Sequence, residues 1–275
     1  MRTALVGTKQ LGLDALTVLR ARTDVTSIVT MDDRNDSRSR FKEFLAAGAR
    51  VVTHRHEAAA EIAAIDADIV LIVGWYWLLG QELLSKSRFL GIHHSLLPEY
   101  RGGSPLVWAL IEGQETVGTT IFELTAGADE GPVWAQARVP VGEGYIGAVA
   151  ARCDNEAIRL LPRVLEPNAH GVEQQHARAT WRPQRHPRDG LIDWHWPARR
   201  VERWVRAQSR PYPGAFAYAG SEKVVIWRAR ATEALADGPI GTYVQGSVVC
   251  GDGRGLQIEE SSFELIDGIL LSAAS

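Results

Sequence analysis

The sequence predicts an α/β fold, a mostly parallel sheet with helices on both faces, followed by a small β-rich subdomain. In the first half of the chain, continuous apolar segments alternate with segments of helical spacing, a pattern typical of a parallel sheet covered on both faces. After about residue 180 the pattern changes to short strand-like segments with glycine-rich turns. We therefore expect a Rossmann-like domain over residues 1–182 and a β-rich C-terminal subdomain over 183–275.

Each element of the first half follows from its local pattern. Short apolar runs predict strands, and apolar residues at helical spacing predict the helices between them. Ligands of such sheets collect beyond the carboxyl ends of the strands, so we look for chemistry there. The expected strands are 3–7, 25–31, 51–54 and 67–74, and the expected helices are 10–22, 37–49, 57–65 and 105–113.

The second part of the chain begins with a polar segment, RPQRHPRDG at 182–190, whose two prolines and Asp-Gly pair indicate a boundary. A helix is expected at 198–208, and short strands are expected within 214–220, 223–231 and 255–273. The tryptophan-rich segment 193–204 either packs the subdomain internally or covers the interface of a homodimer. We favour packing.

The composition argues against several classes of partner. The 275 residues include 30 Lys and Arg against 33 Asp and Glu, whereas proteins that bind nucleic acids through phosphates normally carry a basic excess. Cys153 and Cys250 lie far apart without a CxxC pair, which predicts reduced thiols and no metal site. Apolar spans of membrane length and a signal-peptide core are both lacking. We expect a cytoplasmic protein that binds neither nucleic acid nor membranes.

The loop after the first strand does not match a nucleotide-binding motif. Residues 7–12 read GTKQLG, which is not GxGxxG, and Leu13 occupies the position of the P-loop lysine. Nicotinamide and nucleotide-phosphate binding at this loop are therefore not expected.

The segment FLGIHHSLLPEYRGGSP, residues 89–105, carries the densest polar chemistry. His93 directly follows an apolar strand-like run, so the turn places its imidazole at the ligand edge of the sheet. Histidine titrates near neutral pH and exchanges protons with an attacking amine. Asp129, in the turn GADEG, is a candidate to orient that imidazole. The alternatives are a loop histidine with satisfied hydrogen bonds and an aspartate that caps its own turn.

Residues 91–134 resemble the catalytic segment of the folate-dependent formyltransferases, and 189–194 and 210–216 resemble the start of the C-terminal subdomain in the sugar-nucleotide and tRNA members. The family pattern is Asn-x-His-x-Ser-Leu-Leu-Pro-x-x-Arg-Gly, then Pro, Gly-x-Thr and Asp-x-Gly. The matching positions here are His93, Ser95 to Pro98, Arg101, Gly102, Pro105, Gly118, Thr119, Asp129 and Gly131.

The resemblance implies N10-formyltetrahydrofolate as one-carbon donor and a small-molecule primary amine as acceptor, such as an amino-sugar nucleotide or a natural-product or siderophore precursor. Initiator tRNA fits worse, because Arg254 is the only positive charge after Ala231. His93 and Asp129 would be catalytic, and Ser95 and Arg101 would bind the acceptor. An ST-turn for Ser95 and a surface position for Arg101 are the alternatives. The resemblance also implies a wall for the pterin, formed by Trp75, Tyr76, Trp77 and Leu78. The alternative is a plain aromatic cluster at the strand end.

One position departs from the family pattern: Gly91 stands where the family has an asparagine, whose amide holds the formyl oxygen. Loss of such a donor costs about 10²–10³ in rate. Four explanations are open. Either another donor, such as His94, a main-chain N–H or water, replaces the amide, or the site takes a bulkier acceptor or another one-carbon group. The third explanation is an engineered sequence, and the fourth is the loss of transfer. We favour an active enzyme. The alternatives are a formyl-tetrahydrofolate hydrolase and a non-catalytic folate or nucleotide binder.

Overall fold

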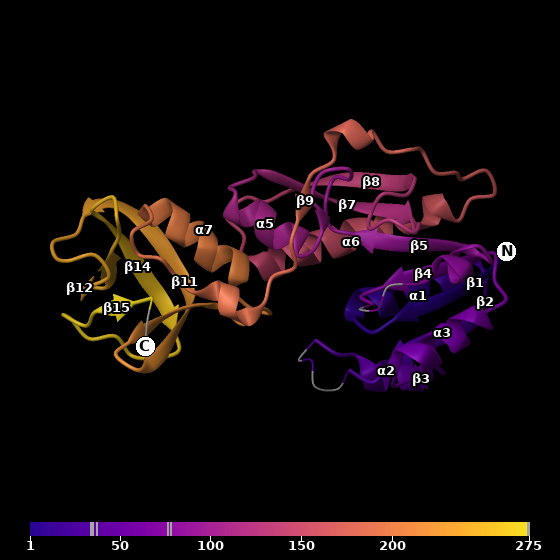
Figure 1. The fold of residues 1–275 in the computed structure, drawn as a ribbon, viewed down its shortest axis with the longest axis horizontal. Helices are drawn as coiled ribbons and strands as arrows, with labels where there is room; N and C mark the ends of the chain where they lie inside the picture. The colour runs from indigo at the N-terminus through magenta and orange to yellow at the C-terminus, as the bar shows by residue number, and fades with distance from the viewer. Residues whose placement is uncertain (34–35, 37, 76, 78, 274–275) are drawn as a thin grey trace. The chain divides into compact units, whose positions relative to one another are not determined.

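The computed structural model describes residues 1–33, 36, 38–75, 77 and 79–273, and Figure 1 labels its elements. Within these residues, no helix is both long and apolar enough to cross a membrane. The chain forms two units. The predicted division into a domain of residues 1–182 and a domain of residues 183–275 stays a prediction. The first unit comprises Met1–Gly102, Val117–Val139 and Ala151–Trp181, and the second comprises Gly103–Thr116, Pro140–Ala150 and Arg182–Ser275.

A seven-stranded sheet organises the first unit, in the order β3-β2-β1-β4-β5-β7-β8. Its first five strands pair in parallel, and β7 pairs antiparallel to β5. The predicted mostly parallel sheet is confirmed. The strands are β1 (Arg2–Gly7), β2 (Asp24–Met31), β3 (Arg50–Val52), β4 (Ile69–Val73), β5 (Arg88–His93), β7 (Thr116–Glu123) and β8 (Val133–Pro140).

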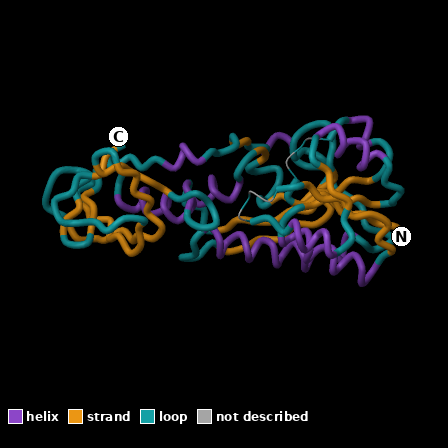
Figure 2. The backbone as a smooth tube through the Cα atoms, turned by 90° about the horizontal axis from the view of Figure 1, so that it is seen from below, coloured by secondary structure: helices purple, strands orange, loops and turns teal. Residues whose placement is uncertain are grey.

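Helices cover both faces of this sheet, as predicted (Figure 2). Successive residues of a strand point to opposite faces, so each strand feeds two cores. The core that contains Leu5 includes α1 (Gln10–Arg22) and the part of α6 (Ile146–Val164) from Ala157 onward. The core that contains the next residue, Val6, includes α3 (Arg55–Ala63).

The predicted helix 37–49 is shorter in the structure, where α2 spans Phe41–Ala46. Gly48 has a φ of 86°, the left-handed conformation that ends many helices. The amide of Ala49 donates to the carbonyl of Phe44, which completes this terminating turn. Residue 37 lies outside the described residues. The sequence assigned no elements to α4 (Gln81–Leu84), β7, β8 or α6.

The second unit combines helices with an antiparallel sheet of order β12-β13-β14-β11-β10-β15, which confirms the β-rich subdomain. Helix α7 (Ala198–Gln208) matches the predicted range, and α5 (Pro105–Ile111) ends two residues early. Trp194 is buried in the core beneath this sheet, and Trp196 and Trp204 pack against that core. The strands are β10 (Ala215–Ala219), β11 (Glu222–Leu235), β12 (Tyr243–Val244), β13 (Ser247–Val249), β14 (Arg254–Ser261) and β15 (Leu271–Ser272).

Short elements complete the chain: β6 (Arg101–Gly102), β9 (Trp181–Arg182) and the 3₁₀ turns η1 (His176–Arg178) and η2 (Pro187–Gly190). Thr120 of β7 fixes the segment that follows β5. Its hydroxyl is fully buried and donates to the carbonyl of Ser95 at 2.7 Å. The same oxygen accepts from the side-chain amide of Gln136 at 2.8 Å and from the main-chain amide of Leu97 at 3.4 Å.

Replacing Thr120 with valine should leave these buried groups without a partner. A buried unsatisfied donor or acceptor costs about 1–3 kcal/mol. We expect Thr120→Val to lower the free energy of unfolding in urea by about that amount. Thr116→Val, at the exposed start of the same strand, is the control and should change it little. Equal stability of the two variants would contradict this account of the segment after β5.

Candidate active site

His93 is the last residue of β5, at the carboxyl end of the parallel strands. Its side chain is 10% exposed, and its Nε2 lies 2.8 Å from the carbonyl oxygen of Tyr100. Its Nδ1 lies 3.8 Å from Oδ2 of Asp129, which is longer than a direct hydrogen bond. Phe122 of β7 packs edge-on to the ring, with 6.3 Å between centroids. The structure therefore brings together the two residues that the sequence predicted as catalytic, with a gap between them.

These contacts define the protonation of the imidazole. A carbonyl oxygen only accepts, so Nε2 carries the proton that it donates to Tyr100, and Nδ1 keeps its lone pair. Burial lowers the pKa of His93 below its ordinary value, while the Asp129 carboxylate and the Tyr100 carbonyl act in the opposite direction. Near neutral pH the ring is a neutral base whose free nitrogen faces a carboxylate.

Asp129 reaches His93 by an indirect route. Because β7 is antiparallel to β5, β7 ends near the start of β5, where the amide of Leu124 donates to the carbonyl of Phe89. The following loop turns back toward the end of β5. Asp129 has a φ of 55°, which aspartate tolerates better than most residues. Its Oδ2 accepts a 2.7 Å hydrogen bond from the amide of Gly102.

A buried network holds this loop. The side-chain amide of Gln174 donates to the carbonyls of Asp129 and Gly131 at 3.0 and 2.7 Å. Its oxygen accepts from Nε and one terminal nitrogen of Arg101 at 3.2 and 2.7 Å. The Arg101 side chain is only 3% exposed, and Nδ1 of His176 lies 3.2 Å from the same terminal nitrogen. Arg101 thus has internal partners, and its contact with an acceptor stays a prediction.

Two further residues of the predicted loop also have partners within the protein. The hydroxyl of Ser95 is buried and donates to the carbonyl of Glu99 at 2.7 Å, so its contact with an acceptor also stays a prediction. The ring of His94 is held at Nε2 by Asp154, at 2.8 Å, and at Nδ1 by Thr119, at 3.2 Å. Both ring nitrogens of His94 are in use, so His94 does not supply the donor missing at Gly91.

Apolar side chains fill the space beside Gly91. A Cβ atom at this position would lie 2.8 Å from Cδ2 of Leu124 and 3.2 Å from Cε1 of Phe122. Real Cβ contacts are longer than the first of these, so an asparagine fits only if Leu124 moves. Residues 91 and 93 share one face of β5, so this apolar wall lies on the same face as the His93 ring.

The predicted pterin wall lies partly within the described residues. Trp75 and Trp77 meet edge-on at 5.4 Å between centroids and line a cavity of about 500 Å³ with α3 and α4. The indole N–H of Trp75 is buried and has no hydrogen-bond partner among the described residues. Both rings pack against the core of Val6 and Phe89, on the face of the sheet that also carries Gly91 and His93. Tyr76 and Leu78 lie outside the described residues.

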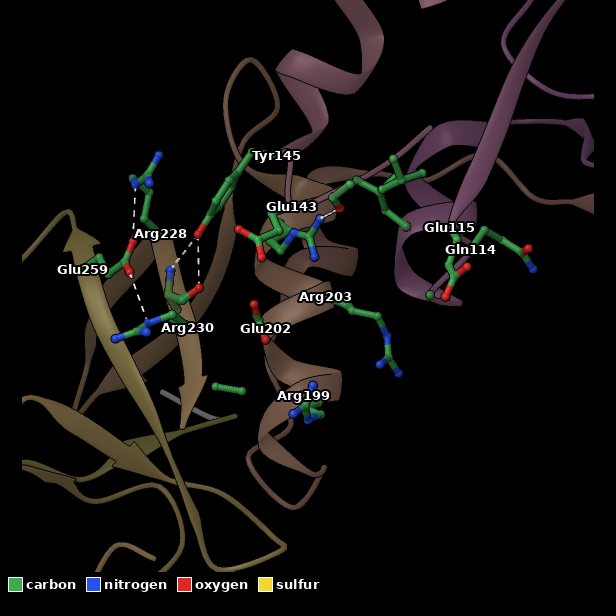
Figure 3. A pocket seen from close by; sticks show the side chains of 17 residues that line it. Gln114, Glu115, Glu143, Tyr145, Arg199, Glu202, Arg203, Arg228, Arg230 and Glu259 are labelled. Carbon is green, nitrogen blue, oxygen red and sulfur yellow. Dashed lines mark hydrogen bonds and ion pairs between the residues drawn. The ribbon is translucent and has the colours of Figure 1, made fainter. Parts of the chain in front are cut away.

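A larger cavity, of about 800 Å³, lies within the second unit and contains none of the predicted site residues (Figure 3). Arginines of α7 and β11 line it together with four glutamates, and Glu259 lies within 4 Å of both Arg228 and Arg230. The charges nearly balance, so the lining does not specify the charge of a ligand.

The two cysteines lie in different units and are both buried and free. Burial raises the pKa of the Cys153 thiol to about 12, and it raises that of Cys250 to about 12 as well. The thiolate is the reactive form, so neither side chain is suited to nucleophilic chemistry near neutral pH.

A sheet with a histidine base at its ligand edge, followed by an antiparallel subdomain, is an arrangement that can be compared with known families. A model of the formyl transferase family matches residues 8–165, more than half of the chain, and a model of the formyl transferase C-terminal domain matches residues 185–265. The chain belongs to the formyl transferase family, as the sequence motifs indicated.

Solved structures share the fold at low identity. HypX from Aquifex aeolicus, in complex with tetrahydrofolic acid, has a TM-score of 0.70 and 20% identity over 95% of this chain and 44% of HypX. Methionyl-tRNA formyltransferase from Clostridium thermocellum has a TM-score of 0.66 and 18% identity over 85% and 95% of the two chains. The N-formyltransferase from Helicobacter canadensis, in complex with folinic acid and dTDP-3-aminofucose, has a TM-score of 0.72 and 12% identity over 93% and 98%. The chain spans less than half the length of HypX.

Sequence reasoning did not find several residues of this site. Gln174 and Asp154 contact it from 45 and 60 residues away, without a motif that marks them. Tyr100 contributes its main-chain carbonyl, which no side-chain pattern reveals. Thr119 follows Gly118 of the family pattern, and its hydrogen bond to His94 was not expected.

The electrostatics of His93 predict a pH dependence. A neutral base is present above its pKa, so any activity that uses His93 should fall as pH drops through a value below the ordinary 6.5 or so. Asp129→Asn removes the carboxylate that raises this pKa. The inflection of kcat/KM should therefore move to lower pH, while kcat on the plateau falls by about 10².

Glu130→Gln removes one negative charge from the same loop and is the matched control for Asp129→Asn. Its carboxylate is not among the groups that shift the pKa of His93, so the inflection should stay at the wild-type pH. An inflection that stays in place or rises in Asp129→Asn would refute the electrostatic link between the two residues.

Proposed function

We propose that this protein transfers a formyl group from N10-formyltetrahydrofolate to a primary amine of a small molecule. The observation that carries the proposal is the neutral imidazole of His93 between the carbonyl of Tyr100 and the carboxylate of Asp129, in a chain of the formyl transferase family. The solved relatives with bound tetrahydrofolic acid and folinic acid support the choice of donor. The relative with dTDP-3-aminofucose supports an amino-sugar nucleotide as one class of acceptor.

In the proposed reaction, His93 manages the proton. As the amine nitrogen bonds to the formyl carbon, Nδ1 of His93 accepts the proton that the amine loses. The bond between the formyl carbon and N10 then breaks, and Nδ1 returns the proton to N10 of the departing tetrahydrofolate. Asp129 stabilises the imidazolium that exists between the two transfers, and Tyr100 keeps the ring oriented through Nε2.

The cavity at Trp75 and Trp77 fits a flat heterocycle. Aromatic and aliphatic side chains line it, as is typical of small-molecule sites. The unpartnered indole N–H of Trp75 is available to an acceptor atom of such a ligand. We therefore propose this cavity as the pterin end of the folate site, with His93 on the same face of the sheet.

The first test separates transfer from hydrolysis. The protein is incubated with N10-formyltetrahydrofolate, with and without a panel of amino-sugar nucleotides and small amines, while tetrahydrofolate release and the formylated amine are measured. We expect release to depend on an amine. His93→Ala should abolish it without unfolding the protein, and His170→Ala, at an exposed site, should not. Release without amine supports a hydrolase instead, and retained activity in His93→Ala would end the assignment of His93.

The second test concerns Gly91. Gly91→Asn alone should not restore an amide donor, because its Cβ meets Leu124. Gly91→Asn combined with Leu124→Ala makes room for the amide, and we expect its kcat to exceed that of Leu124→Ala by about tenfold or more, within the range typical of an oxyanion donor. If the double variant is no faster than Leu124→Ala, an amide at this position does not serve the reaction of this chain. Zero turnover in the wild type and all variants would favour a binding protein.

A further inference from the structure

His94 directly follows β5, points to the side opposite His93 and joins three elements. Alternate residues of a strand share a face, and Leu90 and Ile92 both point to the core that α6 covers. His94 continues this series. Its Nε2 lies 2.8 Å from Oδ1 of Asp154 on α6, and its Nδ1 lies 3.2 Å from the hydroxyl of Thr119 on β7. One side chain thus ties the end of β5 to a helix and to the neighbouring strand.

Few contacts hold the His93 ring itself. The ring itself has one hydrogen bond, to a main-chain carbonyl, and a 3.8 Å approach to Asp129. Besides the edge-on contact with Phe122, the ring takes its orientation from the backbone at the end of β5, and His94 is the very next residue. Thr119 and Thr120 hold two neighbouring residues of this segment: Thr119 binds the His94 side chain, and Thr120 binds the carbonyl of Ser95.

His94 also bears on the charge of His93. The charged groups that shift the pKa of His93 are Asp129, which raises it, and His94, which lowers it. Asp129 and His94 therefore act on the pKa of His93 in opposite directions.

We propose that His94 and Asp154 form a positioning pair for His93, which fixes the end of β5 and with it the place of the His93 imidazole. This inference rests on the proposed function, because it assigns the pair a role in the reaction of His93. These two residues act on His93 only indirectly, through the main chain and through electrostatic interaction, so they are positioning residues. His94 and Asp154 are not among the described residues that line the cavity at Trp75 and Trp77.

The test measures His93 directly. The pKa of its ring is followed by NMR in the wild type, His94→Gln and Asp154→Asn, with His93→Gln used to assign the signal. His94→Gln removes the neighbour that lowers the His93 pKa, so that pKa should move upward. Asp154→Asn leaves His94 in place and should move the His93 pKa by less than His94→Gln does. Glu156→Gln, which removes one negative charge from the same helix and whose carboxylate pairs with Arg159, is the matched control and should leave it unchanged.

Activity supplies the second readout. We expect kcat to fall about tenfold or more in His94→Gln, with KM for folate and amine nearly unchanged and the acid inflection of kcat/KM moved to higher pH. A lower melting temperature with an unmoved His93 pKa would overturn the proposal in favour of a merely structural contact. Failure of the proposed function looks different: His93→Ala would remain active, or no amine would be formylated, while the NMR result would still test the effect of the pair on His93.

Discussion

The antiparallel pairing of β5 with β7 is the constraint on which the candidate site depends. It places the middle of β7, and not its end, against the last residues of β5, with His93 opposite Thr120 and Gly91 opposite Phe122. Thr119 therefore meets His94, and the loop after β7 must turn back to bring Asp129 to His93. A parallel β7 would offer only its carboxyl end to this edge, and the side chains around the imidazole would come from elsewhere.

Burial and charge oppose each other at His93. Burial favours the neutral ring, and a carboxylate 3.8 Å away favours the cation. Two unit charges at about 4 Å attract by about 4 kcal/mol when the effective dielectric constant is near 20. In the proposed reaction this attraction becomes available only when His93 takes up a proton, so it favours the charged intermediate state over the resting site. Catalysis requires that kind of difference, since equal stabilisation of both states does not raise kcat.

The local sequence pattern predicted those elements that depend on local sequence. Helix α1 and strands β1, β2 and β4 follow from apolar spacing, and the family motif located His93 and Asp129. The apolar residues of β7 do not reveal the direction of this strand, because it would bury the same residues in a parallel and in an antiparallel pairing. From its sequence, Arg101 is expected to bind the acceptor, with a surface position as the alternative. In the structure, Gln174, 73 residues away, accepts two of its hydrogen bonds and helps to bury it. Such contacts depend on how distant segments of the chain meet, which one sequence does not specify.

Gly91 shows why a missing side chain and an empty space are different. In the sequence, the glycine reads as the loss of an amide, which leaves a gap for water or a larger acceptor. In the structure, Phe122 and Leu124 occupy the space, and Phe122 also contacts the His93 ring. An apolar wall excludes water from one side of the imidazole and so favours its neutral form. In the proposed reaction, no amide at position 91 then stabilises the developing oxyanion, so a larger share of that stabilisation has to come from the imidazolium of His93.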